Sequence, residues 1–313
     1  MQGYIILLIM QKLVVIGFVA ATAFATKQHP INAELVKTIR ERTSSWIAHD
    51  PETNPFRNYT IEKLRGMCGT IISSNIQDAD MDYDEPVLVQ GLPSSFDWRD
   101  QLAGAVHPIR DQKQCGSCWA FAATEAHSDR LFIHSQGAVD VVLSPQDMVS
   151  CDPWDLGCNG GILSFAWSYI KNTGVVADAC IPYTSGDGTV ASCPKQCTGS
   201  GPWTKYKCDG NVVSSSGPDR IQSDIYANGP VETGFTVYED FMSYKSGIYV
   251  HTAGAQLGGH AVKIIGWGTA DDGTQYWICA NSWGTSWGED GFFNIAFGQC
   301  GIDSTTYACK PKW

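Results

Sequence analysis

The sequence predicts an α+β protein of two lobes, a mainly helical lobe followed by a mainly β lobe. Apolar, helix-compatible segments dominate the stretch from Cys118 to Gly174. Beyond a loop rich in Gly, Ser, Pro and Cys, β-branched and aromatic runs separated by turn residues take over. Helices gathered in one half and strands in the other are typical of α+β architecture.

The composition of the 313 residues is that of a folded, acidic protein. Hydrophobic residues make up 43% of the chain, charged residues 17%, and the formal net charge is −11. This balance is globular rather than disordered, and the length accommodates one large domain or two lobes. The negative charge argues against nucleic acid as a partner.

Residues 1–25 are predicted to be a secretory signal peptide. A short apolar run after Lys12 ends in Ala23-Phe24-Ala25, which fits an A-x-A cleavage site. The run is too short to span a membrane with any margin, and no later apolar run reaches that length. Translation from Met10 instead of Met1 would give a more ordinary signal. We therefore expect a secretory chain with no membrane span in its mature form.

Residues 26–91 differ in character from the rest and are predicted to form a separate segment. Leu35, Ile39 and Trp46 follow helical spacing, and a loop containing two prolines ends that helix. Asn58 begins an Asn-Tyr-Thr glycosylation acceptor, which requires an exposed position in a secreted chain. The acidic, polar stretch 74–93 is typical of a cleavable linker.

Denser, more aromatic sequence begins at about Leu92. A buried helix is expected from Cys118 with Ser117 as its N-cap, a second with Ser144 as N-cap, and a third ending at Gly174. One further short helix is expected near 218–227, and the expected strands include 235–238, 247–250, 261–267 and 275–280.

The motif CGSCWAF at 115–121 places two cysteines three residues apart. Cys115 and Cys118 fit a redox pair, half of a metal site, or two thiols with separate tasks. Twelve cysteines in a secreted chain favour a disulfide framework. Cys193 and Cys197 are four residues apart, so no second C-x-x-C completes a zinc site, and we expect neither metal nor cofactor.

Cys118 is the candidate nucleophile because a helix N-terminus stabilises a thiolate. A thiolate needs an imidazole partner, and His260 is the best candidate, since two glycines precede it and a strand follows. Asn281 ends the next apolar strand and would orient the imidazole, while Trp283 would shield their hydrogen bond. We expect the Cys118 sulfur to lie exposed and ionised at the mouth of a groove.

From Leu92 to its end, the chain resembles papain-like cysteine peptidases. The motifs DQKQCGSCWAF, GCNGG, GGHAVKIIGWG and NSWGTSWGEDGFF carry this resemblance. ELVKTIRERTSSWIA and LRGMCGT resemble the short propeptide of the cathepsin B subfamily, and GPVETGFTVYEDFMSYKSGIYVH resembles its right lobe. The resemblance implies a papain-like fold with the active-site cleft between a helical left lobe, 92–205, and a β-barrel-like right lobe, 206–313.

The resemblance also implies roles for single residues. Cys118 would be the nucleophile, His260 its proton partner and Asn281 the residue that orients the ring. Gln112 would stabilise the oxyanion together with the Cys118 N–H. Gly160 and Gly161 would bind an extended substrate backbone. Further expected substrate-binding residues are Ile162, Leu163, Gly234, Ala261, Trp283 and Thr305.

The family pattern answers the question that the two cysteines raise. It implies that Cys115 pairs with Cys158, which leaves Cys118 free. It also implies the pairs Cys151–Cys193 and Cys180–Cys197. A fourth pair, Cys208–Cys309, depends on whether the strands that carry these residues are neighbours, and it stays open at this point. Cys68, Cys279 and Cys300 are expected to remain unpaired.

Two departures from cathepsin B bear on specificity. The stretch CIPYTSGDGTVASC replaces a long occluding loop and contains no histidine. We therefore expect an open primed side and endopeptidase activity with little trimming of dipeptides. Thr305 stands where cathepsin B has a glutamate in its S2 pocket, so apolar side chains are expected at P2, the second residue before the scissile bond. Asp303 is close enough in sequence to supply a carboxylate instead.

As a secreted or lysosomal zymogen, the chain would use residues 26–91 as an intramolecular inhibitor, with MCGTIISS running through the cleft. Expected partners are protein and peptide substrates and cystatin-type inhibitors, and we expect a monomer. Three rival hypotheses share parts of this evidence. They are a catalytically inactive binding protein on the same fold, a transpeptidase using the same acyl-enzyme, and a dithiol oxidoreductase that needs Cys115 free.

Overall fold

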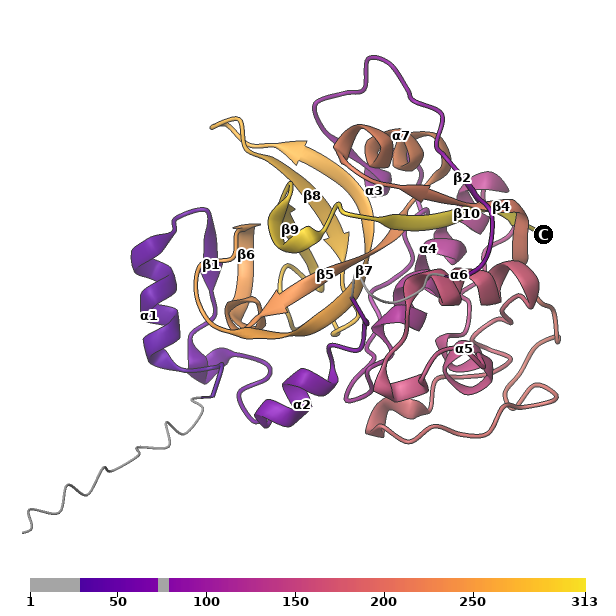
Figure 1. The fold of residues 1–313 in the computed structure, drawn as a ribbon, viewed down its shortest axis with the longest axis horizontal. Helices are drawn as coiled ribbons and strands as arrows, with labels where there is room; N and C mark the ends of the chain where they lie inside the picture. Colours follow the sequence, from indigo (N-terminus) through magenta and orange to yellow (C-terminus); the bar gives the residue numbers. More distant parts are fainter. Residues whose placement is uncertain (1–28, 73–78) are drawn as a thin grey trace, which may run out of the picture.

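The computed structural model describes residues 29–72 and 79–313, so the predicted signal peptide lies outside the described part. Helices and strands segregate as expected: in Figure 1 the helices α4, α5 and α6 gather on one side and the long strands on the other. Within the described residues, no helix has the length and apolar character needed to cross a membrane.

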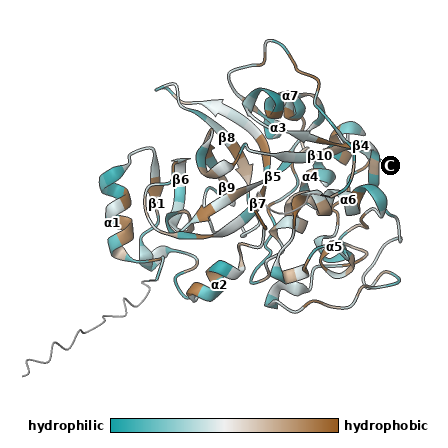
Figure 2. Ribbon diagram, in the orientation of Figure 1, coloured by the Kyte–Doolittle hydropathy of each residue, from teal (hydrophilic) through white to brown (hydrophobic). Residues whose placement is uncertain are grey.

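The segment before Leu92 wraps around both lobes instead of forming one of its own. Its N-terminal helix α1 packs on the β lobe through Val36 and Ile39. Figure 2 shows hydrophilic and hydrophobic residues side by side on α1 and α2, as amphipathic helices require. The elements of this segment are α1 (Ala33–Arg42), β1 (Trp46–Ala48), η1 (Pro51–Thr53), α2 (Ile61–Gly66) and β2 (Tyr83–Asp84).

The expected single helix reaching Trp46 is wrong, because α1 ends at Arg42. Trp46 instead begins β1, which pairs antiparallel with β6 (Tyr244–Tyr249). The indole is buried and donates from Nε1 to the Val250 carbonyl over 3.0 Å. An extended backbone gains ladder hydrogen bonds here that a further helical turn would not, which decides the local structure.

The helical lobe is organised around α4 (Cys118–His134), which is almost entirely buried. It contacts α5 and α6 on one side and strands of the sheet on the other. Ser144 caps α5 through its hydroxyl, as expected, by accepting the Asp147 N–H. The other elements of this lobe are β3 (Phe96–Asp97), α3 (Trp98–Gln101), α5 (Pro145–Cys151), η2 (Gly157–Asn159), α6 (Leu163–Asn172) and η3 (Ser185–Asp187).

The strands form one sheet that is not closed into a barrel within the described residues, unlike the expected barrel-like lobe. Its order is β1-β6-β9-β8-β7-β5-β10-β4-β2, with β3 pairing β7 off this path. The remaining elements are β4 (Lys207–Ser215), α7 (Pro218–Asn228), β5 (Val231–Tyr238), η4 (Glu239–Ser243), β7 (Gln256–Thr269), β8 (Gln275–Ala280), β9 (Phe292–Ala296), η5 (Gln299–Gly301) and β10 (Thr306–Lys312).

Both ends of the sheet are occupied by strands from before Leu92. At one end β1 pairs with β6, and at the other β2 pairs parallel with β4. Exposed strand edges present unpaired N–H and C=O groups that invite pairing. The N-terminal segment therefore satisfies both edges at once. The acidic stretch from 74 to 93, predicted to be a cleavable linker, contributes β2 to this arrangement.

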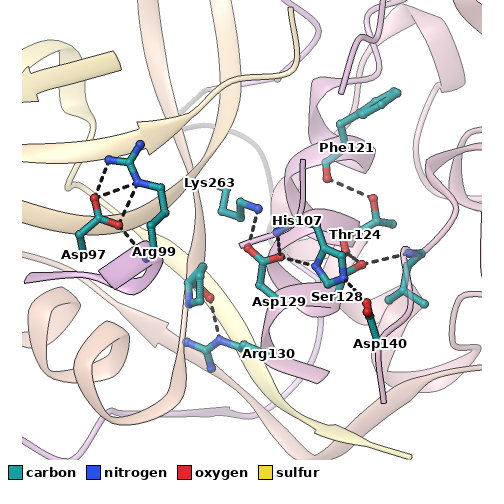
Figure 3. Close-up of polar contacts among 12 residues, drawn as sticks. Asp97, Arg99, His107, Phe121, Thr124, Ser128, Asp129, Arg130, Asp140 and Lys263 are labelled. Atoms are coloured by element: carbon teal, nitrogen blue, oxygen red, sulfur yellow. Dashed lines mark hydrogen bonds and ion pairs between the residues drawn. The ribbon is translucent and has the colours of Figure 1, made fainter. Parts of the chain in front are cut away.

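A charged cluster with a buried centre joins the two lobes (Figure 3). Asp129 on α4 accepts hydrogen bonds from Lys263 on β7 and from the His107 ring. Asp140 contacts the other nitrogen of the ring at 3.2 Å. Burial lowers the pKa of His107, but the hydrogen bond and charge of Asp129 outweigh burial and hold that pKa above its usual value. The cluster fixes the helix that begins at Cys118 against the strand that carries His260.

Candidate active site

Cys118 is the first residue of α4, where the helix N–H groups point toward its sulfur. The Ser117 hydroxyl does not cap this helix, contrary to expectation, because it bonds to the Tyr183 hydroxyl at 3.0 Å. The Cys118 sulfur is buried and lies 3.2 Å from Oγ1 of Thr70. The expected exposed and ionised sulfur is therefore wrong for this form of the protein.

Burial controls the charge of the sulfur. It raises the pKa of Cys118, while Thr70 and nearby backbone N–H groups act in the opposite direction without cancelling it. The thiol is thus kept neutral under the segment that covers it.

His260 lies on β7, and Asn281 directly follows the neighbouring antiparallel strand β8. Nε2 of His260 is 2.7 Å from Oδ1 of Asn281, and the Trp283 ring lies 4.5 Å from the imidazole, centroid to centroid. Nδ1 makes no hydrogen bond of good geometry within the described residues, although the Met67 carbonyl of the N-terminal segment lies close enough to act on the ring. Burial lowers the pKa of His260 to about 4, although Asn281 and the Met67 carbonyl oppose it.

Gln112 connects the two sides of the cleft. Its Oε1 accepts from the Ser282 hydroxyl at 2.8 Å, next to Asn281, which fixes the amide orientation. Its Nε2 donates to two carbonyls, Cys115 at 2.7 Å and Met67 at 3.0 Å. The Gln112 Nε2–H group, which is predicted to stabilise the oxyanion, therefore donates to the Met67 carbonyl of the N-terminal segment in this form.

After Met67, which still has helical backbone angles, the segment from Gly69 to Ile72 lies across the cleft and forms β-bridges with both lobes. Ser73 and Ser74, the end of the expected MCGTIISS stretch, lie outside the described residues. The Gly161 N–H donates to the Gly69 carbonyl at 2.8 Å, and the Ile71 N–H donates to the Gly161 carbonyl at 2.9 Å. On the opposite side the Thr70 N–H donates to the Gly259 carbonyl at 3.0 Å. One extended backbone is thus bound by both lobes, directly over the Cys118 sulfur.

Small residues are needed where this backbone passes. Gly160 has a φ of +116°, and a Cβ there would lie 2.6 Å from the Gly69 carbonyl oxygen. A Cβ on Gly161 would lie 2.5 Å from the Trp119 ring. Any larger side chain would therefore push the bound backbone away or displace the tryptophan.

Comparison with known proteins identifies the family of this chain. Residues 92–309 match the family model described as papain family cysteine protease.

This chain belongs to the papain family of cysteine proteases.

Its relatives are cathepsin B-like. The chain is 38% identical to cathepsin B-like cysteine proteinase 4 of Caenorhabditis elegans, over 97% of this chain and all of the relative. It is also 38% identical to cathepsin B of Dictyostelium discoideum, over 97% of this chain and 99% of the relative. The solved structure of procathepsin B S9 from Trypanosoma congolense matches with a TM-score of 0.80 and 30% identity, covering 91% of this chain and all of that one. The protein is therefore a cathepsin B-like cysteine peptidase, and the proform neighbour supports an N-terminal propeptide that acts as an intramolecular inhibitor.

Four disulfides stabilise this peptidase, and three of them join the pairs that the resemblance implies. The pair left open, Cys208–Cys309, is formed because β4 and β10 are neighbours. Cys68, Cys118, Cys279 and Cys300 are free. The other pairs are Cys115–Cys158, Cys151–Cys193 and Cys180–Cys197.

A cavity of about 490 Å³ lies beside the bound propeptide, and it brings together four of the expected substrate-binding residues, Ile162, Leu163, Gly234 and Thr305. Ala261 does not line this cavity, because its backbone lies at the Cys118 sulfur instead. Trp283 also lies elsewhere, over the His260–Asn281 pair.

Sequence reasoning missed several residues that hold the site in place. Ser282 fixes the Gln112 amide, and its position directly after Asn281 was the available signal. Met67 and Thr70 belong to MCGTIISS, which the sequence places in the cleft, but their contacts with the oxyanion donor and the sulfur were not predicted. Asn58 is exposed just before α2, a position open to glycosylation.

Proposed function

We propose that the mature enzyme begins near Leu92 and is an endopeptidase that cleaves extended peptides through a thioester on Cys118. One observation carries this proposal: an extended backbone already lies across the sulfur, hydrogen-bonded to Gly161 on one side and Gly259 on the other. A groove that binds one such backbone suits a substrate once the propeptide leaves. A secretory destination, either a lysosome, a lysosome-like vacuole or the extracellular space, fits this acid-tolerant zymogen.

The proposed chemistry uses three side chains. The Cys118 thiolate attacks the peptide carbonyl carbon, while the Gln112 Nε2–H and the Cys118 N–H stabilise the oxyanion. His260 then gives its proton to the leaving amine as the C–N bond breaks, which leaves a thioester. Water adds to the thioester, His260 takes one of its protons, and release of the acid restores the thiolate and the imidazolium.

Labelling decides whether this site is catalytic. Acidified protein should take up one epoxide inhibitor on Cys118, and N-terminal sequencing of the labelled form should begin near Leu92. Failure of Cys118 to label after the propeptide is removed would contradict the proposal.

A second experiment distinguishes hydrolysis of the thioester from its transfer to an amine. When an amine nucleophile is added during turnover, a hydrolase yields mostly free acid and a transpeptidase yields mostly amide.

We further propose that the primed side is open. Residues 181–192 contain no Lys, Arg or His, and their one charged residue is Asp187. The loop packs against the Gln112 segment, where the Tyr183 hydroxyl donates to the Gln112 carbonyl at 2.9 Å and the Gln114 N–H donates to the Gly186 carbonyl at 3.0 Å. A substrate's C-terminal carboxylate would meet no cation on this loop and would be repelled by Asp187.

Matched peptides test this proposal. Two peptides share the same scissile bond. In the first peptide, two residues and a free C-terminal carboxylate follow this bond. In the second, the chain continues beyond those two residues and ends in an amide. The extended peptide should be cleaved with the higher kcat/KM. Faster release of the dipeptide would show that a carboxylate is recognised and would overturn the open primed side.

Apolar side chains are the proposed preference at P2. Thr305 lines the cavity, and the side chain of the propeptide's Ile72 already lies at its wall beside Gly234. The Asp303 carboxylate is absent from the lining and accepts hydrogen bonds from the Gly298 N–H at 2.8 Å and the Trp277 indole at 3.4 Å. No carboxylate is thus offered to a basic P2 residue.

A peptide library varied at P2 measures this preference. The wild-type enzyme should favour apolar residues, and Thr305→Glu should shift the preference toward arginine. Asp303→Asn is the matched control and should leave the preference unchanged. A dominant preference of the wild-type enzyme for peptides with arginine at P2 would refute the assignment.

A further inference from the structure

The loop that binds the substrate backbone is held by its own acidic side chains. Residues 152–162, here called the glycine loop, run from the C-cap of α5 to the N-cap of α6 and carry Gly160 and Gly161. The Asp155 carboxylate reaches across the loop, where its Oδ1 accepts the Ile162 N–H at 2.7 Å. The Leu156 N–H donates to the Gly160 carbonyl at 2.8 Å and closes the same turn.

A second carboxylate faces the first. Asp152 uses Oδ1 to accept the Trp154 N–H at 2.9 Å. The carboxylates of Asp152 and Asp155 lie close enough that each shifts the pKa of the other, and the two residues are only 7% and 8% exposed. Their Oδ2 atoms are buried and receive no donor from any other described group. Two buried acceptors in this arrangement need a proton between them, because two charges there would repel without solvent.

We propose that Asp152 and Asp155 share one proton, and that this proton holds the glycine loop in its substrate-binding conformation. Asp155 is thus a positioning residue, since it acts on the substrate through Ile162 and the neighbouring glycines. The inference rests on the proposed function, because it concerns binding of a substrate backbone to Gly161.

The electrostatic environment supports a retained proton. Burial, followed by the charge of Asp152, raises the pKa of Asp155 to about 8, and burial raises that of Asp152 to about 6. Two other titratable groups interact with the pair, Glu232 with Asp155 and Tyr169 with Asp152, and Tyr169 in turn contacts Asp147. Glu232 on β5 has a pKa raised well above its usual value by burial, Tyr169 on α6 has a raised pKa for the same reason, and Asp147 on α5 is paired with Lys205 at 2.6 Å.

The sign of the pH effect follows from these raised pKa values. The folded loop favours the protonated pair, so its stabilisation is complete at acidic pH and is lost as pH rises through about 6 to 8. Above that range both carboxylates are charged and repel each other, and the loop opens. Because an open loop does not bind the backbone, the apparent KM should rise by about tenfold between about pH 6 and about pH 9.

The Asp155→Asn variant removes the shared proton but keeps a side chain of the same shape and hydrogen-bonding capacity, so it distinguishes the role of the proton from that of the side chain. The amide oxygen can still accept the Ile162 N–H, and the amide N–H can donate to Asp152 without any shared proton. In the activated enzyme, KM for a peptide with three residues before the scissile bond should stay flat with pH in this variant while it rises in the wild type. Asp155→Ala should raise KM at every pH. Asp271→Asn, an exposed aspartate on the β7–β8 turn, is the matched control for lost charge and should follow the wild type.

Two further readouts separate this inference from the proposed function. Alkylation of Cys118 by a small thiol reagent does not use the glycine loop, so its pH profile should be the same in wild type and Asp155→Asn. Infrared difference spectra between the wild-type and Asp155→Asn proforms, in which the protonated Glu232 common to both cancels, should show a protonated carboxyl band from the wild type that disappears as the pH passes about 8. Parallel KM profiles in the two proteins, or absence of that band in the wild-type proform, would overturn the shared proton whether or not the enzyme is active.

Discussion

The two halves of the active site are built by different means. In the helical lobe, Cys118, Gln112 and Gly161 lie on a helix N-terminus and on loops, and disulfides flank these loops. In the β lobe, His260 and Asn281 lie on or directly after neighbouring antiparallel strands, where register alone brings them to 2.7 Å. The first half depends on a few covalent and polar links, and the second depends on the continuity of a sheet.

The difference explains how one propeptide can inhibit both halves. It adds strands to the two edges of the sheet, which holds it firmly, and from there it passes one extended segment over the loops. At the loops it contacts the sulfur, the oxyanion donor and Gly161 with consecutive residues. Strong binding at the rigid edges therefore supports weaker, reversible contacts at the catalytic groups.

The largest effect should come from the half built on strands. His260→Ala removes the proton partner, and loss of such a base in an acyl-transfer site lowers kcat by about 10⁴ or more. Steady-state kinetics on protein activated by an added protease measures it. His134→Ala, at the opposite end of α4, is the control and should retain activity. Substantial turnover by the His260 variant would show that register in the sheet does not create the catalytic pair.

A smaller loss is expected in the half built on loops. Gln112→Ala removes one of two oxyanion donors, which costs about 10²–10³ in kcat with little change in KM. The variant should still label on Cys118, because the sulfur and His260 are untouched. Gln114→Ala, an exposed neighbour, should behave like the wild type. A large rise in KM with unchanged kcat would instead assign Gln112 to substrate binding.

Removal of the propeptide should change the charges of Cys118 and His260 together. Burial raises the pKa of Cys118 and lowers that of His260, so both groups are neutral in the proform. Exposure reverses both shifts and favours thiolate and imidazolium. At about pH 6, alkylation of Cys118 should therefore be faster in the mature enzyme, by about tenfold for each pKa unit relieved. Cys118→Ser corrects for other thiols, and equal rates in the two forms would contradict this account.

The sequence predicts most of the chemistry because motifs place Cys118, His260 and Asn281 on elements whose ends can be recognised. It fails where a distant partner decides the outcome. Trp46 fits a helix by spacing, but its strand partner β6 lies some 200 residues away. The Ser117 hydroxyl fits a cap, yet Tyr183 takes it. The buried state of Cys118 follows from the propeptide segment over the cleft, where the resemblance places MCGTIISS, whereas the residues around Cys118 alone favour an exposed sulfur.

The smallest change in catalysis is expected when one of two disulfides, Cys115–Cys158 or Cys208–Cys309, is removed. Both removals should lower stability, but only one should affect KM. Removing either bridge by a double Cys→Ser substitution should lower the free energy of unfolding by about 2–4 kcal/mol, with Cys208–Cys309 costing about 1 kcal/mol more because it spans 101 residues against 43 for Cys115–Cys158. Loss of Cys115–Cys158 should also raise KM severalfold, because Cys158 immediately precedes the segment Asn159–Gly161 that binds the backbone. Loss of Cys208–Cys309 should leave KM unchanged, since β4 and β10 keep their register through other pairs. Denaturant unfolding and kinetics on the same preparations measure both quantities. Equal effects on KM would mean that the loops of the helical lobe are as rigid as the strands, and the contrast between the two halves would not hold.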